Sequence, residues 1–140
     1  MKSFSNIEKQ KIIFNAYSNP QYNLKNKKEG GIFEHSSICV DELTLYLTFQ
    51  NNVLIKANYF AEGCAVFIAS VELVIEQLLN KNKEDINKIL DAYFEMINQK
   101  EYDSNVKLNK LIVFENVKAH LNRLECASIV YRAFKKGING

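Results

Sequence analysis

The fold of this chain is decided by one segment, FAEGCAVFIAS at residues 60–70. The apolar run at 53–60 predicts a strand, and the residues after Gly63, rich in Ala, Val, Ile, Leu and Glu, predict a helix to about residue 79. Gly63 lies at the switch, where a tight bend often needs a residue without a side chain. Cys64 then falls in the first turn of the helix, where unpaired N–H groups and the helix dipole favour a thiolate over a thiol.

The residues before this segment predict a small antiparallel sheet. Apolar residues alternate at positions 43, 45, 47 and 49, which is typical of a strand with one buried face. Asn51-Asn52 predicts a hairpin turn, with 53–60 as the antiparallel partner strand. A further short strand is expected at 32–38.

Helical segments flank the sheet on both sides along the chain. Ser5 and Glu8 have the spacing of a capping box, and the first helix is expected to end at Asn19-Pro20. Residues 86–97 carry apolar side chains at helical spacing and predict an amphipathic helix. The segments between these elements are predicted to be a charged connection at 81–84, a polar loop at 99–109 and a short helical piece at 111–120. A last helix is expected to open at 122–125, to run through Phe134 and to stop at Gly137. This order predicts the α+β class.

Length and composition indicate a single domain that spans residues 1–140. A hydrophobic fraction of 47% with 24% charged residues is typical of a globular protein, and a net charge of +2 is too small to indicate binding to nucleic acid or an anionic membrane. No apolar stretch reaches the length of a membrane span, and the N-terminus lacks the pattern of a signal peptide. Three widely spaced cysteines do not suit a disulfide framework, so reduced thiols and a cytoplasmic location are expected.

Each of the three cysteines falls at the boundary of a predicted element. Cys39 precedes the strand at 43–49, while Cys64 and Cys126 fall in the first turns of two predicted helices, where the helix dipole helps a thiol to ionise. Asp41 adds a carboxylate close to Cys39. Three thiolates and one carboxylate would form a tetrahedral set of zinc ligands, although the sequence has no C-x-x-C motif. The competing interpretation is that the three cysteines are buried structural thiols.

Other chemical motifs have less support in the sequence. His35 and His120 are alternative metal ligands, but a lone histidine is more often a surface or hydrogen-bonded residue. No serine lies in a nucleophile-elbow context, so Ser-His-Asp catalysis is not indicated. Gly30-Gly31 predicts a flexible turn and not a phosphate-binding loop.

Four blocks of the sequence resemble the motifs of a known family. AYSNP at 16–20 is similar to HYKNP, and CVD at 39–41 stands in the place of CGD. EGCAVFIAS at 62–70 is similar to EGCSISMAS, and RLECAS at 123–128 is similar to the start of RIKCATL. These blocks span most of the chain and are specific as a set. On them the chain resembles the NifU N-terminal/IscU/SufU family of iron–sulfur cluster assembly proteins.

Within that family the resemblance is closest to the SufU branch. The IscU branch has a histidine immediately before its third cysteine, and this chain has Glu125 there, where the SufU branch usually has lysine. The chain also has a long segment between its second and third cysteines, including 100–103, as the SufU branch does. Val40 replaces the family's glycine, and a β-branched residue does not easily take a positive φ, which bears on how Cys39 and Asp41 are oriented.

The resemblance implies an α+β fold in which a small three-stranded antiparallel sheet packs against about four to five helices. It implies a metal or cluster site formed by Cys39, Asp41, Cys64 and Cys126, with zinc as the bound metal. In a zinc-dependent sulfur transfer, Cys39 would accept persulfide sulfur from a SufS-like cysteine desulfurase. The recipients would be apo-iron–sulfur proteins or a scaffold, and Arg123 would have a supporting role. The alternative is a scaffold on which a labile [2Fe–2S] cluster is built on the same residues. A monomer is expected because the sequence has no heptad seam.

Overall fold

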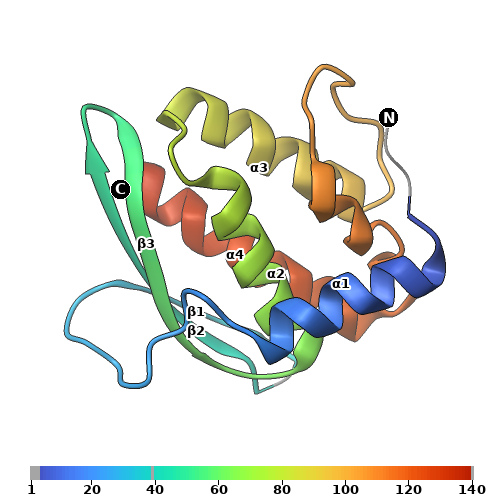
Figure 1. Cartoon of the computed structure of the whole chain (residues 1–140), viewed down its shortest axis with the longest axis horizontal. Helices are drawn as coiled ribbons and strands as arrows, with labels where there is room; N and C mark the ends of the chain where they lie inside the picture. Colours follow the sequence, from blue (N-terminus) through green and yellow to red (C-terminus); the bar gives the residue numbers. More distant parts are fainter. Residues whose placement is uncertain (1–3, 39, 140) are drawn as a thin grey trace.

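The computed structural model of the chain describes residues 4–38 and 40–139. It has an α+β fold in which a three-stranded antiparallel sheet, in the order β1-β2-β3, lies beside a layer of helices (Figure 1), as the sequence predicts. Every helix in the described ranges is too short or too polar to span a bilayer. The elements in chain order are α1 (Asn6–Ser18), β1 (Ile32–His35), β2 (Glu42–Gln50), β3 (Val53–Glu62), α2 (Ala65–Leu78), α3 (Lys83–Ile97), the 3-10 helices η1 (Asn109–Phe114) and η2 (Val117–Ala119), and α4 (Leu121–Asn139).

Strands β2 and β3 form the hairpin that the alternating sequence predicts. Gln50 pairs with Val53, and the two residues between them, Asn51 and Asn52, have φ angles of 52° and 69°. Two consecutive positive φ angles give a turn whose twist matches that of the strands, and asparagine tolerates this conformation better than most residues. The predicted hairpin and its turn are therefore confirmed.

Strand β1 is shorter than predicted, because the chain turns at Ser36 instead of continuing as a strand to residue 38. The buried Ser36 donates its N–H to the carbonyl oxygen of Asp41 at 3.0 Å. Its hydroxyl oxygen accepts the N–H of Ile38 at 3.1 Å. These two hydrogen bonds close a tight connection between β1 and β2, and the connection brings Asp41 to the start of β2.

Helix α2 is the central helix of the molecule, and most of its side chains are buried. Its one buried charge, Glu72, accepts the N–H groups of Gln21 and Tyr22 at 2.7 and 3.1 Å and the hydroxyl of Tyr59 at 2.7 Å. Burial and the neighbouring carboxylate raise the pKa of Tyr59. A buried carboxylate with three donors is well compensated, and this one ties the loop after α1 to both α2 and the sheet.

Side-chain caps set the starts of α1 and α3. Ser5 and Glu8 form the reciprocal capping box that the sequence predicts at the start of α1. Helix α3 begins at Lys83, three residues before the predicted amphipathic segment, because the side chain of Asn82 accepts the N–H of Asp85 at 2.8 Å. The predicted charged connection at this point is correspondingly shorter.

The C-terminal third differs from the sequence prediction in two places. Residues 111–120 do not form one helical piece but contribute to the two 3-10 helices. Helix α4 does not stop at Gly137 but continues to Asn139. A Cβ atom at Gly137 would lie 2.6 Å from Cδ1 of Ile32 and 2.8 Å from Cδ1 of Leu47. This glycine therefore lets α4 pack closely on the sheet and does not end the helix.

Candidate metal centre

Three polar side chains from distant parts of the chain meet where β2 begins and β3 ends: Asp41, Cys64 and Cys126. One ligand atom from each residue lies within 4.8 Å of the other two. The Sγ atom of Cys126 is 2.8 Å from Oδ2 of Asp41 and 3.3 Å from Sγ of Cys64. The distance from Sγ of Cys64 to Oδ2 of Asp41 is 3.8 Å. Cys39, the fourth predicted ligand, lies outside the described residues.

Asp41 is fixed by its place beside the end of the sheet. It directly precedes β2, and the next residue, Glu42, pairs with Glu62 at the end of β3. This pairing places Asp41 opposite the residues that follow β3, where its Oδ1 accepts the N–H of Cys64 at 3.0 Å. The side chain is almost fully buried, at 2% exposure, so the carboxylate is held both in position and away from bulk water.

Cys64 is the N-cap of α2, one residue before the first turn in which the sequence placed it. Its Sγ accepts the N–H of Phe67 at 3.5 Å, and the residue as a whole is exposed. Gly63 provides the space for this arrangement, because a Cβ atom there would overlap both Oδ1 of Asp41 and the ring of Phe67. The predicted need for a small residue at this bend is confirmed, and its cause is the close approach of Asp41.

Cys126 lies in the second turn of α4 and not in the first, because the helix begins at Leu121. The residue is buried, at 4% exposure. Burial raises the pKa of its thiol, and the neighbouring Asp41 and Cys64 raise it further. The prediction that a helix N-terminus promotes ionisation of Cys126 is therefore wrong. A bound cation would reverse this preference, because metal-ligating thiols are deprotonated.

The other predicted site residues lie apart from this group. His35 is in β1, where its Nδ1 lies 3.0 Å from the carbonyl oxygen of Ser36, and His120 is the C-cap of η2. Neither belongs to the group of potential metal ligands found among residues 4–38 and 40–139. Arg123 is exposed in the first turn of α4, one helical turn before Cys126.

The donor set indicates which metals suit the site. Two sulfur atoms and one carboxylate oxygen fit a borderline-soft divalent cation such as zinc, which takes four tetrahedral ligands in closed sites. Cysteine thiolates are also the usual ligands of iron–sulfur clusters. The residues present therefore fit either group.

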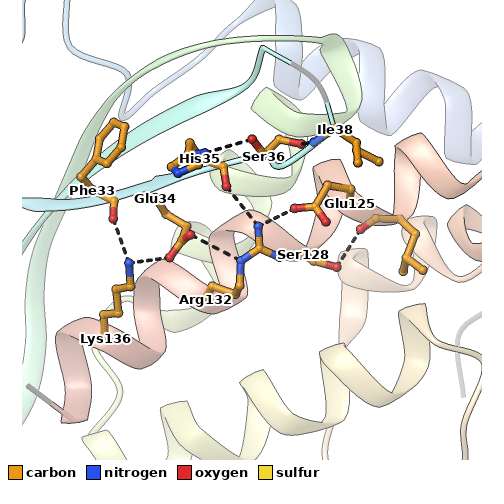
Figure 2. A network of polar contacts seen from close by, with 10 residues as sticks. Phe33, Glu34, His35, Ser36, Ile38, Glu125, Ser128, Arg132 and Lys136 are labelled. Carbon is orange, nitrogen blue, oxygen red and sulfur yellow. Dashed lines mark hydrogen bonds and ion pairs between the residues drawn. The ribbon is translucent and has the colours of Figure 1, made fainter.

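An ion-pair network that was not predicted from the sequence ties α4 to β1 (Figure 2), and one of its members, Glu125, directly precedes Cys126. Arg132 contacts both Glu125 and Glu34, and Lys136 contacts Glu34. One face of α4 carries Glu125, Arg132 and Lys136 at helical spacing. This spacing is the feature of the sequence from which a charged face could have been predicted. Their partner on β1 is distant in sequence, so the pairing itself leaves no local pattern.

Comparison with known proteins agrees with this site. Residues 8–92 match the family described as the NifU-like N terminal domain. The chain is 24% identical over 136 residues to the zinc-dependent sulfurtransferase SufU of Bacillus subtilis, an alignment that covers 92% of this chain and 88% of the relative. It is 25% identical over 100 residues to the iron–sulfur cluster assembly scaffold protein IscU of Thermotoga maritima, covering 71% of this chain and 70% of the relative.

A solved structure shows the same fold. The crystal structure of a Fervidobacterium islandicum protein, described as an iron–sulfur cluster assembly scaffold protein for the SUF system, matches with a TM-score of 0.80 and 26% identity. The match covers 91% of this chain and 93% of that chain. The predicted resemblance, including its SufU branch, is thus confirmed. The chain belongs to the family of NifU-like N-terminal domains.

Proposed function

We propose that this protein is a zinc-binding sulfur acceptor in iron–sulfur cluster assembly, and that Cys39 receives persulfide sulfur from a cysteine desulfurase. The observation that carries the proposal is the meeting of Asp41, Cys64 and Cys126 within a NifU-like domain. The two sulfurs and the carboxylate fit zinc, and zinc is favoured over a cluster because the Bacillus subtilis relative is named zinc-dependent.

In this proposal Asp41, Cys64 and Cys126 hold the zinc ion and Cys39 supplies the fourth ligand. Zinc has no redox chemistry, so when bound it would protect the thiolates from oxidation. The assignment of Cys39 rests on its place in the CVD block. Ile38 and Val40, which precede and follow Cys39 in the sequence, are 55% and 88% exposed, so a partner can reach the side chains of both sequence neighbours of the proposed acceptor.

The transfer itself is a sulfur exchange. The thiolate of Cys39 attacks the outer sulfur of the desulfurase persulfide, and a new S–S bond forms on Cys39. The S–S bond within the desulfurase persulfide breaks, and the desulfurase cysteine leaves as a thiolate. The proton on the transferred sulfur stays with it, and no external oxidant or reductant is needed.

The surface beside the site suits a protein partner, and we place the desulfurase there. A groove of about 430 Å³ is lined in part by Ile38, Phe94 and Tyr131, and the two aromatic rings stack with centroids 4.3 Å apart. Exposed apolar side chains that line a groove mark interaction sites, and Ile38 and Phe94 are such side chains here. Arg123 is exposed on the same end of α4 and takes the supporting role.

Metal analysis and desulfurase kinetics test the proposal. Protein purified without a chelator should contain about one zinc per chain and no sulfide, as a closed four-ligand site requires. Adding the protein should stimulate a cysteine desulfurase, and Cys39→Ala should abolish the stimulation. Ser37→Ala is the matched control, because Ser37 is exposed in the same connection. Stimulation by Cys39→Ala equal to that of the parent would show that Cys39 is not the acceptor.

A second candidate function is that of a scaffold that carries a labile [2Fe–2S] cluster as cargo for apo-proteins. It is favoured by the Thermotoga maritima relative and by the Fervidobacterium islandicum structure, both described as cluster assembly scaffolds. The same four residues would bind the cluster. Anaerobic reconstitution followed by visible absorption distinguishes the two functions. No cluster under conditions that load the Thermotoga maritima protein would rule out the scaffold.

We further propose that residues 1–140 act as one monomeric domain in the cytoplasm. The family match ends at residue 92, but α4 supplies Cys126 and packs on α2, α3, β1 and β2. The C-terminal part therefore belongs to the same site. Reduced thiols persist in the cytoplasm, as sulfur transfer requires. Light scattering during gel filtration should give the mass of a single chain, and a dimer mass would contradict this.

A further inference from the structure

Arg132 joins three groups next to the candidate metal centre, as Figure 2 shows. Its Nη2 donates hydrogen bonds to Oε1 of Glu125 and, at 3.3 Å, to the carbonyl oxygen of His35. Its Nε lies 3.5 Å from Oε1 of Glu34. The guanidinium therefore bridges α4 to the last two residues of β1, which its forked, planar donors allow it to do.

The two chain segments joined by Arg132 lie next to those that meet inside the metal centre. His35 pairs with Glu42, the residue after Asp41. Glu125 is the residue before Cys126. Arg132 thus connects α4, from outside, to the strand that pairs with the start of β2, next to the 2.8 Å contact between Cys126 and Asp41. Its hydrogen-bond and ion-pair partners among residues 4–38 and 40–139 are Glu34, His35 and Glu125.

The side chains of this bridge are partly buried. Glu34 is 13% exposed, Glu125 is 20% exposed and Arg132 is 35% exposed. Ion pairs at fully exposed sites hold little in place, whereas a partly buried guanidinium that is bound to several partners is more strongly fixed. Oε1 of Glu125 accepts a hydrogen bond from Arg132. Glu125 does not belong to the group of potential metal ligands found among the described residues.

We propose that Arg132 is a positioning residue of the metal centre, which holds the turn of α4 that carries Cys126 against the end of β1. The inference rests on the metal site of the proposed function but concerns a residue outside it. Loss of Arg132 frees this turn of α4 from β1, so that Cys126 is no longer held at a fixed distance from Asp41.

Lys136 provides a matched control from the same network. It lies one turn further along α4 and donates to the carbonyl oxygen of Phe33 at 3.1 Å and to Oε2 of Glu34 at 2.7 Å. It therefore links the same helix to the same strand. Unlike Arg132, it does not contact Glu125 or His35 among the described residues.

The first test uses metal-free protein and needs no activity. The rate at which iodoacetamide alkylates Cys126 is measured by mass spectrometry, with chelator and reductant present, for the parent, Arg132→Met and Lys136→Met. Because Cys126 is buried, its alkylation reports local opening of this part of α4. Arg132→Met should react roughly tenfold faster than the parent, and Lys136→Met within about twofold. Equal rates in the two variants would overturn the proposal, and circular dichroism checks that both are folded.

The second test measures zinc affinity by competition with a chromophoric chelator. Arg132→Met should bind zinc about tenfold more weakly, the lower end of the effect of outer-shell residues, and Lys136→Met should bind like the parent. If the parent binds no zinc, the zinc site of the proposed function is wrong, and the alkylation rates alone then decide the role of Arg132.

A double variant tests the route through Glu125. If Arg132 acts through this contact, Arg132→Met combined with Glu125→Gln should alkylate no faster than Arg132→Met alone, because effects within one network are not additive. If the rate increases caused by the two single substitutions multiplied in the double variant, Arg132 would not act through its contact with Glu125.

Discussion

The Sγ atom of Cys126 lies 2.8 Å from Oδ2 of Asp41, although the two residues are 85 positions apart in the chain. Asp41 is held there by the sheet and by the N–H of Cys64, while Cys126 arrives on the last helix. This contact therefore depends on the packing of α4 against the sheet. Changes to either layer are expected to alter metal binding before they unfold the protein.

Asp41→Ala should weaken zinc binding because it removes a ligand atom. The loss should exceed the roughly 10–100-fold that outer-shell changes cause. Asp41→Asn keeps an acceptor for the N–H of Cys64 but removes the charge, so its affinity should lie between those of Asp41→Ala and the parent. Glu42→Ala is the control, because Glu42 is exposed and adjacent. Chelator competition measures all four, and parent-like affinity in Asp41→Ala would exclude Asp41 as a ligand.

Gly63→Ala should disrupt the metal centre by steric overlap. The new Cβ would overlap Oδ1 of Asp41 and the ring of Phe67, so one of the two must move. Zinc affinity should fall together with thermal stability. Gly30→Ala separates the two effects: it has open space but a φ of 79°, so it should lower stability without affecting zinc. Unchanged zinc affinity in Gly63→Ala would contradict the observed approach of Asp41.

The stabilising contribution of Glu34 to the folded state should be lost at acidic pH. Burial alone would raise the pKa of Glu34, but Lys136 and Arg132 outweigh it and hold the pKa below its ordinary value of 4.5. The ionised form is thus favoured in the folded state, so its contribution is full above pH 4.5 and is lost as the pH falls through the lower, folded-state pKa. Urea unfolding of Glu34→Gln should therefore show a smaller loss of stability between neutral and acidic pH than the parent shows.

The exposed residue Glu29 supplies the control for this pH experiment. Glu29→Gln removes one carboxylate from the loop before β1 and should leave the pH dependence like that of the parent. A parent-like pH dependence in Glu34→Gln as well would mean that the network does not favour the ionised carboxylate.

Two buried tyrosines should differ in how much their hydroxyl groups contribute to stability. Tyr59 donates to the buried carboxylate of Glu72, and Tyr93 donates to the carbonyl oxygen of Ala127, both at 2.7 Å. Tyr93→Phe should cost about 1 kcal/mol, whereas Tyr59→Phe should cost about 1.5–3 kcal/mol because its partner is charged. Denaturant unfolding compares them, and a larger loss in Tyr93→Phe would contradict this order.

Much of the fold could be predicted from local sequence. The hairpin follows from alternating residues and Asn51-Asn52, and the start of α1 follows from Ser5 and Glu8. These features depend on neighbouring residues, so their pattern is visible in the chain. Gly137 was interpreted wrongly because a glycine near a helix end usually stops the helix, whereas here it accommodates side chains from two strands.

The candidate site could be predicted only in part. Motif blocks singled out Asp41, Cys64 and Cys126, and the structure brings these three together. The raised pKa of Cys126 was not predicted, because it depends on burial and on two distant neighbours. Arg132 was missed for the same reason, since its partners on β1 are reached only through the folded chain.

The distribution of the metal-binding group along the chain also determines when it is completed during synthesis. Chains emerge from the ribosome with the N-terminus first. Asp41 and Cys64 can meet as soon as the β2–β3 hairpin and the first turn of α2 have emerged. Cys126 follows only with α4, 62 residues after Cys64. Until α4 has emerged, a nascent chain therefore presents an incomplete ligand set, and the candidate site is completed only when this helix docks.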